Sequence, residues 1–206
     1  MKKLFLAVAA FIALSASAQD FSLVQPSKNR GLDIMQTFAQ RQSNREFSSK
    51  ELSDQDLSDL LWATMGQNRD NGKLTAPSCQ NKQEIRLLVF SKDGVSEYMP
   101  STHSLKKLAD GDHRSLVAGR QDFVLQAPVS LVMVADMDKF GSKDERAMMM
   151  VSVDAGIVSE NACVAAAGLG LVTVPRASMD ADGIKKLLGF NDNQILIMNN
   201  PVGYAK

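Results

Sequence analysis

One segment in the second half of the chain constrains the fold more than any other, because residues 144–167 predict a single long helix. Its later part, from Ala155 to Ala167, is apolar on almost every side. A helix without a polar face belongs in the centre of a protein or at a subunit interface. Gly168 and Gly170 are expected to end it. The rest of the fold must therefore cover this helix.

Residues 1–18 have the pattern of a secretory signal peptide. Two lysines precede the apolar run Leu4–Leu14, and the small residues of Ala16–Ala18 supply a cleavage site before Gln19. The alternative, an N-terminal membrane anchor, fits less well, because the run is too short to cross about 30 Å of hydrocarbon at about 1.5 Å per residue. We therefore expect cleavage after Ala18, a periplasmic or secreted product, and no membrane anchor after cleavage.

The charge balance disfavours nucleic acid as a partner. The 206 residues include 23 basic and 23 acidic side chains, so the formal net charge is zero. Nucleic-acid binders of this size usually carry a marked positive excess. The chain also has no glycine-rich phosphate loop of the Rossmann or Walker type. Nucleic acid is therefore not the default partner.

Histidines and cysteines give little support for a metal or disulfide site. His103 and His113 lie in the polar stretch 101–114, which we interpret as a surface loop. A metal site made of these histidines with Asp110 and Asp112 would lack a recognised ligand spacing. Cys79 and Cys163 could pair in an oxidising compartment, but a disulfide needs Cα atoms about 5.5 Å apart. The sequence leaves that pairing open, and Cys163 also fits a buried position in the long helix.

The remaining pattern predicts one domain with mixed elements. We expect an extended arm over residues 19–30 and a domain over residues 31–206. Predicted helices cover 31–42, the segment from Ser53 to Gly66, 144–167, and a segment that Ser178 or Asp180 begins and Gly189 ends. Predicted strands cover 85–90, 95–99, 129–135, 172–174 and 195–198, the first two joined by a hairpin at Asp93-Gly94. This order indicates an α+β fold with helices on a small central sheet.

Two basic residues flank a hydroxyl directly after the first predicted helix. Arg41, Ser43 and Arg45 alternate along the sequence, so their side chains would point the same way if the segment is extended. Two guanidinium groups beside a hydroxyl can hold a phosphate dianion or a ring that becomes negatively charged. The alternative is an ordinary solvated loop, and composition alone favours that alternative.

A second polar cluster precedes the predicted hairpin. The segment Ala76-Pro-Ser-Cys-Gln-Asn-Lys-Gln83 offers a turn with hydroxyl, amide and backbone donors. Ser78, Asn81 and Gln83 are polar side chains that can contact the hydrogen-bonding edge of a flat ring. Taken alone, this motif is weak.

In order along the chain, these and further motifs resemble the nitroreductase superfamily, and within it the SagB-type, thiazoline-oxidase-like branch. The matching segments are Arg41-Gln-Ser-Asn-Arg-Glu-Phe47, Leu60-Leu-Trp-Ala-Thr-Met-Gly-Gln-Asn-Arg69, Ala76–Gln83, Asp154-Ala-Gly156, Glu160-Asn-Ala162, Gly168-Leu-Gly-Leu-Val-Thr-Val-Pro175 and Pro201-Val-Gly-Tyr204. The resemblance covers about residues 31–206. The resemblance implies a nitroreductase-like fold, non-covalently bound FMN and an intertwined homodimer built around the long helix.

The resemblance also assigns roles around the flavin, residue by residue. Arg41 and Ser43 would hold the phosphate and ribityl end, with Lys206 as a further phosphate contact. Arg45 would lie against N1 and O2 of the isoalloxazine ring. Pro77, Ser78 and Cys79 would line the ring from the partner subunit. Asn81 would contact the flavin or its ribityl chain. The segment Pro175, Arg176 and Ala177 would lie near N5.

The function that the resemblance implies is an exported FMN-dependent oxidoreductase. It would transfer hydride between an unidentified donor and a small organic acceptor, and no catalytic side chain is named, because the cofactor carries the chemistry. Two alternatives stay open: a non-enzymatic dimeric module that binds flavin or another ligand, and an unrelated α+β binding domain.

Overall fold

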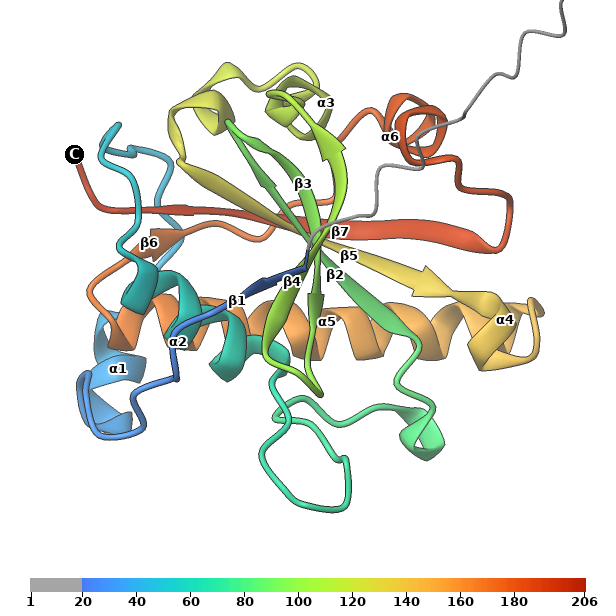
Figure 1. The fold of residues 1–206 in the computed structure, drawn as a ribbon, viewed down its shortest axis with the longest axis horizontal. Coiled ribbons are helices and arrows are strands. Elements are labelled where there is room, and N and C mark those ends of the chain that lie inside the picture. Colours follow the sequence, from blue (N-terminus) through green and yellow to red (C-terminus); the bar gives the residue numbers. More distant parts are fainter. Residues whose placement is uncertain (1–19) are drawn as a thin grey trace, which may run out of the picture.

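The computed structural model describes residues 20–206, and the predicted signal peptide lies outside the described residues. Figure 1 shows an α+β arrangement of a sheet between helices. The strands are β1 (Asp20–Ser22), β2 (Ile85–Ser91), β3 (Gly94–Met99), β4 (Ser104–Asp110), β5 (Val129–Asp136), β6 (Val172–Thr173) and β7 (Gln194–Gly203). The helices are α1 (Ile34–Gln40), α2 (Asp54–Met65), α3 (Arg114–Ala118), α4 (Met137–Phe140), α5 (Glu145–Gly168) and α6 (Ala181–Leu188), with 3-10 turns η1 (Cys79–Asn81) and η2 (Asp122–Gln126).

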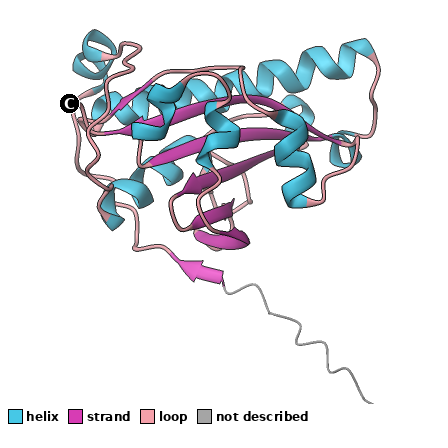
Figure 2. Ribbon diagram, turned by 90° about the horizontal axis from the view of Figure 1, so that it is seen from above, coloured by secondary structure: helices cyan, strands magenta, loops and turns pink. Residues whose placement is uncertain are grey.

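The strands form a seven-stranded antiparallel sheet in the order β1-β4-β3-β2-β5-β7-β6. Strand β5 lies between β2 and β7, and its residues are buried from Val129 to Ala135. A continuous apolar strand of this kind is expected where helices cover both faces of a sheet. Figure 2 shows helices on either side of the strands.

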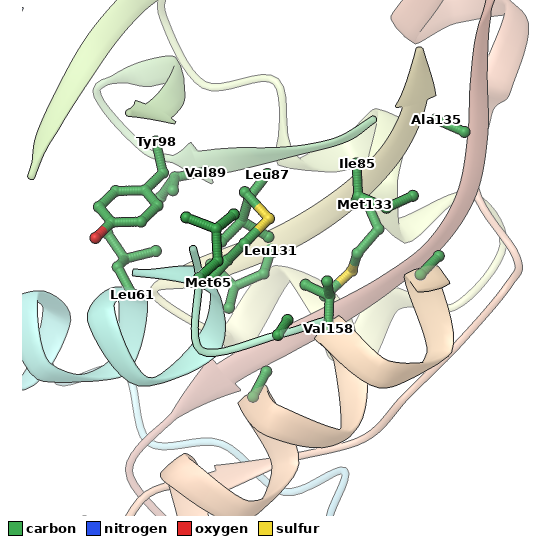
Figure 3. Packing of buried hydrophobic residues seen from close by; sticks show 14 of the residues in the cluster. Leu61, Met65, Ile85, Leu87, Val89, Tyr98, Leu131, Met133, Ala135 and Val158 are labelled. Atoms are coloured by element: carbon green, nitrogen blue, oxygen red, sulfur yellow. The ribbon is translucent and has the colours of Figure 1, made fainter. Parts of the chain in front are cut away.

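The two faces of the sheet contribute to two separate cores. On one face Leu87, Leu131 and Met133 pack against α2 and α5, and Figure 3 shows Leu61, Met65 and Val158 of these helices close to the strand side chains. On the other face Leu88, Val132 and Val134 pack against residues of α3 and α6, among them Val117 and Ile184. Successive residues of β2 and β5 contribute to the two cores in turn, because successive side chains of a strand point to opposite faces of the sheet.

Side-chain caps begin the three longest helices. The hydroxyl of Ser53 accepts the N–H of Asp56 at 3.1 Å, which confirms the predicted start of α2. Asp144 caps α5 and Asp180 caps α6 in the same way. The first helix is shorter than the predicted 31–42, because Asp33 caps it and Ile34 is its first residue.

Helix α5 has a buried side and an exposed side. It packs on α2 and β7 as a core helix, although its length and hydropathy would also allow it to cross a membrane. Met149 and Val153 nevertheless keep 55% and 51% of their surface exposed. Helix α1, which packs on α5, exposes Ile34, Met35 and Phe38 by 59%, 73% and 54%. The described chain therefore shows apolar surface on both helices.

The polar stretch 101–114 is not the predicted surface loop. Residues Ser104–Asp110 form β4, between β1 and β3, so the sheet is larger than the small sheet that the sequence predicts. His103 is half-buried, with Nδ1 2.8 Å from the Tyr98 hydroxyl and Nε2 2.8 Å from that of Ser58. No group of three or more metal-ligating side chains occurs within residues 20–206, so the His103–His113 cluster forms no metal site there.

The N-terminal arm lies along the edge of the sheet and over α2. Strand β1 pairs with β4, and the N–H of Leu23 donates to the carbonyl of His103 at 3.2 Å. Further on, the N–H of Ser27 donates to Asp59 at 2.7 Å, and Arg30 forms an ion pair with Asp59 and another with Asp56. The arm is thus fixed by backbone pairing at one end and by ion pairs at the other.

Candidate functional site

The segment that carries Arg41, Ser43 and Arg45 runs beside β6. Ser43 forms a parallel bridge with Thr173, and the N–H of Asn44 donates to the carbonyl of Thr173 at 2.9 Å. A parallel bridge requires an extended backbone, which is the condition for alternating side chains to share one side. The cluster therefore has the local conformation that the sequence analysis required.

Arg41 lines a pocket of about 350 Å³ where α1, the end of α5 and β6 meet. Cys163 contributes to its wall from α5. Burial raises the pKa of the Cys163 thiol to about 11, and the positive charge of Arg41 acts in the opposite direction. Both cysteines of the chain are free thiols, so the possible Cys79–Cys163 pairing does not occur. The pocket thus combines a guanidinium with a neutral, buried sulfur.

Arg41 and Arg45 differ from several other arginines in their electrostatic surroundings. Arg30, Arg86 and Arg114 each have a carboxylate oxygen within 4.0 Å. Among residues 20–206, no carboxylate lies within that distance of Arg41 or Arg45. Two cations that flank an exposed hydroxyl without acidic partners can accept an anionic ligand.

The side chain of Arg176 is held inside the protein. It is 8% exposed, and its guanidinium donates to Asn199 Oδ1 at 2.7 Å, to Gln121 Oε1 at 2.8 Å and to the carbonyls of Val117 and Ala118 at 3.2 Å. Its backbone N–H donates to the carbonyl of Asn199 at 2.8 Å. Both the side chain and the N–H of Arg176 are thus bonded within the protein, and its flavin contact stays a prediction.

The neighbours of Arg176 remain accessible. Pro175 and Ala177 are exposed on either side of it. Burial lowers the pKa of Arg176, and the positive charge of Arg45 lowers it further, so Arg45 lies near this turn. The structure therefore brings Arg45 close to the 175–177 segment, as the predicted ring site requires, while Arg176 itself anchors the turn.

The second predicted cluster is a loop against α5. The N–H of Cys79 donates to Asp154 Oδ2 at 2.7 Å, and the hydroxyl of Ser78 accepts the N–H of Gln83 at 2.9 Å. Pro77 and Asn81 are exposed, whereas Ser78 and Cys79 are half-buried. The polar groups of Ser78 and the amide of Cys79 are thus used within the protein, and the outward surface of the loop is left for a ligand.

The two clusters lie at separate places within one chain. Cys79 contacts α5 at Asp154, whereas the segment with Arg41 and Arg45 runs beside the edge strand β6, with Arg45 near Arg176. Arg41 is also distant from the loop, because about 12 residues of α5, or roughly 18 Å, separate Asp154 from Ala166 in the pocket wall. One chain therefore does not bring the predicted ring contacts together.

The C-terminal lysine lies at the end of the cationic segment. Ala205 bridges to Phe47, and the N–H of Lys206 donates to the carbonyl of Glu46 at 3.4 Å. The Lys206 side chain is exposed and lines a surface hollow with Arg114 and Ser48. Lys206 is thus next to the residue that follows Arg45, rather than in the pocket wall beside Arg41.

Sequence reasoning missed the residues that support the site. Gln121 and Asn199, which hold Arg176, are 55 and 23 positions away from it and belong to no spacing motif. Glu84 was also missed, although it is a fully buried carboxyl group directly before β2. A buried acid beside a strand gives no sequence signal, because its burial depends on α5 and on the folded loop.

Comparison with known proteins agrees with this geometry. The model of the Nitroreductase family matches residues 38–204. A nitroreductase by name from Methanocaldococcus jannaschii is 30% identical over 176 residues, which cover 79% of this chain and 86% of the relative. A crystal structure of a Ralstonia eutropha protein described as a nitroreductase has a TM-score of 0.85 at 31% identity, covering 100% of this chain and 96% of the other. A structure from Anabaena variabilis resembles the fold with a TM-score of 0.77 at 19% identity, covering 92% of this chain and 42% of the other.

The helix-flanked antiparallel sheet is an α+β fold, and the family model and the relatives identify the class as oxidoreductases of the nitroreductase type. The chain belongs to the nitroreductase family. The predicted nitroreductase-like fold is thereby confirmed.

Proposed function

We propose that the protein is an exported FMN-dependent oxidoreductase of the SagB-type branch that transfers hydride between a donor and a small organic acceptor. The observation that carries this proposal is the pair Arg41 and Arg45, which have no acidic partner among residues 20–206 and lie on the extended segment that also carries Ser43. A phosphate beside Arg41 and an electron-accepting ring beside Arg45 would both be anionic during the reaction, so these residues fit the cofactor.

Each residue of the segment has a separate task in this proposal. Arg41 and the Ser43 hydroxyl bind the phosphate end, and their charge and hydrogen bonds set the affinity. Arg45 stabilises negative charge on the ring, which makes reduction easier. Bound FMN supplies hydride acceptance and donation, so no side chain has to act as an acid or base. The exposed turn at Pro175 and Ala177 limits the ring on its N5 side.

The proposal includes a homodimer. The loop at Pro77–Asn81 and the segment at Arg41–Arg45 lie far apart within one chain, because the loop contacts α5 at Asp154 and the segment runs beside β6 and the far end of α5. A twofold partner can bring the loop of one copy to the cations of the other. The exposed apolar side chains of α1 and α5, Ile34, Met35, Phe38, Met149 and Val153, provide surface of the kind that such an interface buries.

Export, which the N-terminal pattern favours, limits the choice of donor. Nicotinamide donors are cytoplasmic, so an exported enzyme would use another reductant or would oxidise its substrate. The natural substrate is accordingly a small organic molecule that reaches the flavin outside the cytoplasm.

Purified recombinant protein should contain about one FMN per subunit and be yellow. Added FMN should raise the melting temperature of flavin-depleted protein, because a ligand that binds only the folded state stabilises it. Flavin absorbance and thermal denaturation measure both effects. Colourless protein with no FMN-dependent shift would favour an unrelated binding domain. Bound FMN without turnover, with dithionite-reduced protein offered quinone and nitroaromatic acceptors, would favour the non-enzymatic binding module.

The variant Arg41→Ala should weaken FMN binding by about 1–3 kcal/mol, the range for a lost hydrogen bond to a charged group. Fluorescence titration of flavin-depleted protein gives the affinity. Arg120→Ala removes another exposed arginine and serves as the matched control. Equal affinities for both variants and the unmodified protein would exclude the phosphate role of Arg41.

A further inference from the structure

Two carboxyl groups lie buried beneath the loop that carries Cys79. Glu84 is 0% exposed and Asp154 is 5% exposed. Neither carboxyl oxygen of Glu84 has a hydrogen-bond partner among residues 20–206. The backbone of Glu84 is fixed, because its carbonyl accepts the N–H of Asp136 at 2.9 Å. The ionised side chain of Glu84 is therefore buried without a hydrogen-bond partner, whereas the protonated side chain could donate a hydrogen bond through its O–H.

The loop above these groups has an unfavourable backbone conformation. Gln80, Asn81 and Gln83 have φ values of +53°, +56° and +49°, which side-chain-bearing residues rarely adopt. Such a conformation persists only where neighbouring contacts hold it. The bond from the Cys79 N–H to Asp154 Oδ2, at 2.7 Å, joins this loop to α5. Lys82 gives a second attachment through its bond to the carbonyl of Phe140.

The charges around Glu84 favour a single negative charge on the pair. Burial raises the pKa of Glu84 to about 7, and the neighbouring carboxylate of Asp154 raises it as well. Lys82, from the loop, opposes this effect. Two adjacent carboxyl groups in a dry site do not both ionise easily. The O–H of a protonated Glu84 can also donate a hydrogen bond to the carboxylate of Asp154.

We propose that Glu84 and Asp154 share one proton, and that this proton fixes the loop Pro77–Asn81 in place against α5. The two carboxyl groups are positioning residues, because they act through the loop and not on a ligand. The inference rests on the proposed function only where it treats this loop as a wall of the flavin site. The fixing of the loop itself requires no flavin.

Loss of the shared proton should loosen the loop in a defined pH range. Glu84 in an opened, hydrated loop would have its ordinary pKa of 4.5, against about 7 in the closed loop. Between pH 4.5 and about pH 7 the closed loop therefore holds a proton on Glu84 that the opened loop has lost. The closed loop keeps its full stability below pH 4.5, and this stability declines as the pH rises to about 7. By proton linkage the opening equilibrium should increase by up to about tenfold per pH unit in this window and level off above it.

Hydrogen–deuterium exchange of residues 77–83 in flavin-depleted, full-length protein tests the proposal directly. After correction for intrinsic exchange, the unmodified protein should open more readily at pH 7 than at pH 5. Glu84→Gln should show no such pH dependence, because its amide donates to Asp154 at every pH. Glu145→Gln, at an exposed glutamate of the same helix as Asp154, should retain the full dependence.

A second variant keeps the test decisive if Glu84→Gln fails to fold. Asp154→Asn removes the neighbouring charge but keeps an oxygen for the Cys79 N–H, so its pH dependence should still begin near pH 4.5 but level off at a lower pH and be smaller in total. Pro77–Gln83 exchange that is pH-independent in the unmodified protein, or identical in all these variants, would overturn the proposal. FMN titration of the same samples at pH 5 and pH 7 tests the proposed function separately. Absence of FMN binding at both values would refute that function and leave the exchange result valid.

Discussion

Replacing Arg176 with alanine should lower the free energy of unfolding by about 3–5 kcal/mol. The change removes a large buried side chain and leaves four acceptors, on Asn199, Gln121, Val117 and Ala118, without their donor. A cavity and unsatisfied buried polar groups each destabilise a protein by amounts of about 1–3 kcal/mol or more. Urea denaturation followed by circular dichroism measures the loss.

The exposed Arg120 provides the comparison for this experiment, since Arg120→Ala should change stability by less than about 0.5 kcal/mol. The experiment also separates the two roles considered for Arg176. If Arg176→Ala retained full stability and lost only FMN affinity, the side chain would have to leave its internal partners to reach the flavin. Because the Arg176 side chain is hydrogen-bonded inside the protein, we expect Arg176→Ala to lower the stability first and the FMN affinity only as a consequence.

Introducing a charge at Met35 should dissociate the proposed homodimer. Met35 is the most exposed of the large apolar residues in the described chain, at 73%, so Met35→Asp should not unfold a single subunit. Burial of such a side chain contributes about 1.5–3 kcal/mol, and a twofold interface contains it twice. The dissociation constant should therefore rise by at least about 100-fold. Analytical ultracentrifugation over a range of concentrations gives this constant.

The same variant connects assembly with cofactor binding. If the partner's loop completes the ring site, Met35→Asp should bind FMN more weakly at low protein concentration and recover affinity at high concentration. Val24→Asp, at an exposed valine of the N-terminal arm that lies outside α1 and α5, should behave like the unmodified protein. A dimer that persists in Met35→Asp would remove α1 from the interface.

Local chemistry made much of the fold predictable. The Ser53 and Asp180 caps, the Asp93-Gly94 turn and the apolar strand β5 all occur where the sequence indicates them, because each depends on neighbouring residues. Strand β4 was missed, since Lys106 and Lys107 obscure its apolar positions. Leu105 and Leu108 still reach the two cores, one on each face. Their burial depends on β3 and the helices, which no local pattern reveals.

The candidate site could be predicted only in part for a similar reason. The alternation of Arg41, Ser43 and Arg45 is a property of one short segment, and its extended conformation agrees with the expectation. The resemblance assigned Arg176 to the flavin site, and its internal partners Gln121 and Asn199 gave no sequence signal because they are 55 and 23 positions away. The contact between Cys79 and Asp154 joins residues 75 positions apart. The flavin roles of the individual residues remain predictions that the binding experiments test.

The docked N-terminal arm also covers the backbone edge of β4. Strand β1 occupies the backbone hydrogen-bonding edge of β4, which would otherwise be open to an extended segment of another molecule. The ion pairs of Arg30 with Asp56 and Asp59 keep this strand close to its position. A shortened chain that begins after Arg30 would lose both features and offer β4 as a template for intermolecular strand addition. We therefore expect a chain without this arm to be less soluble during expression and storage.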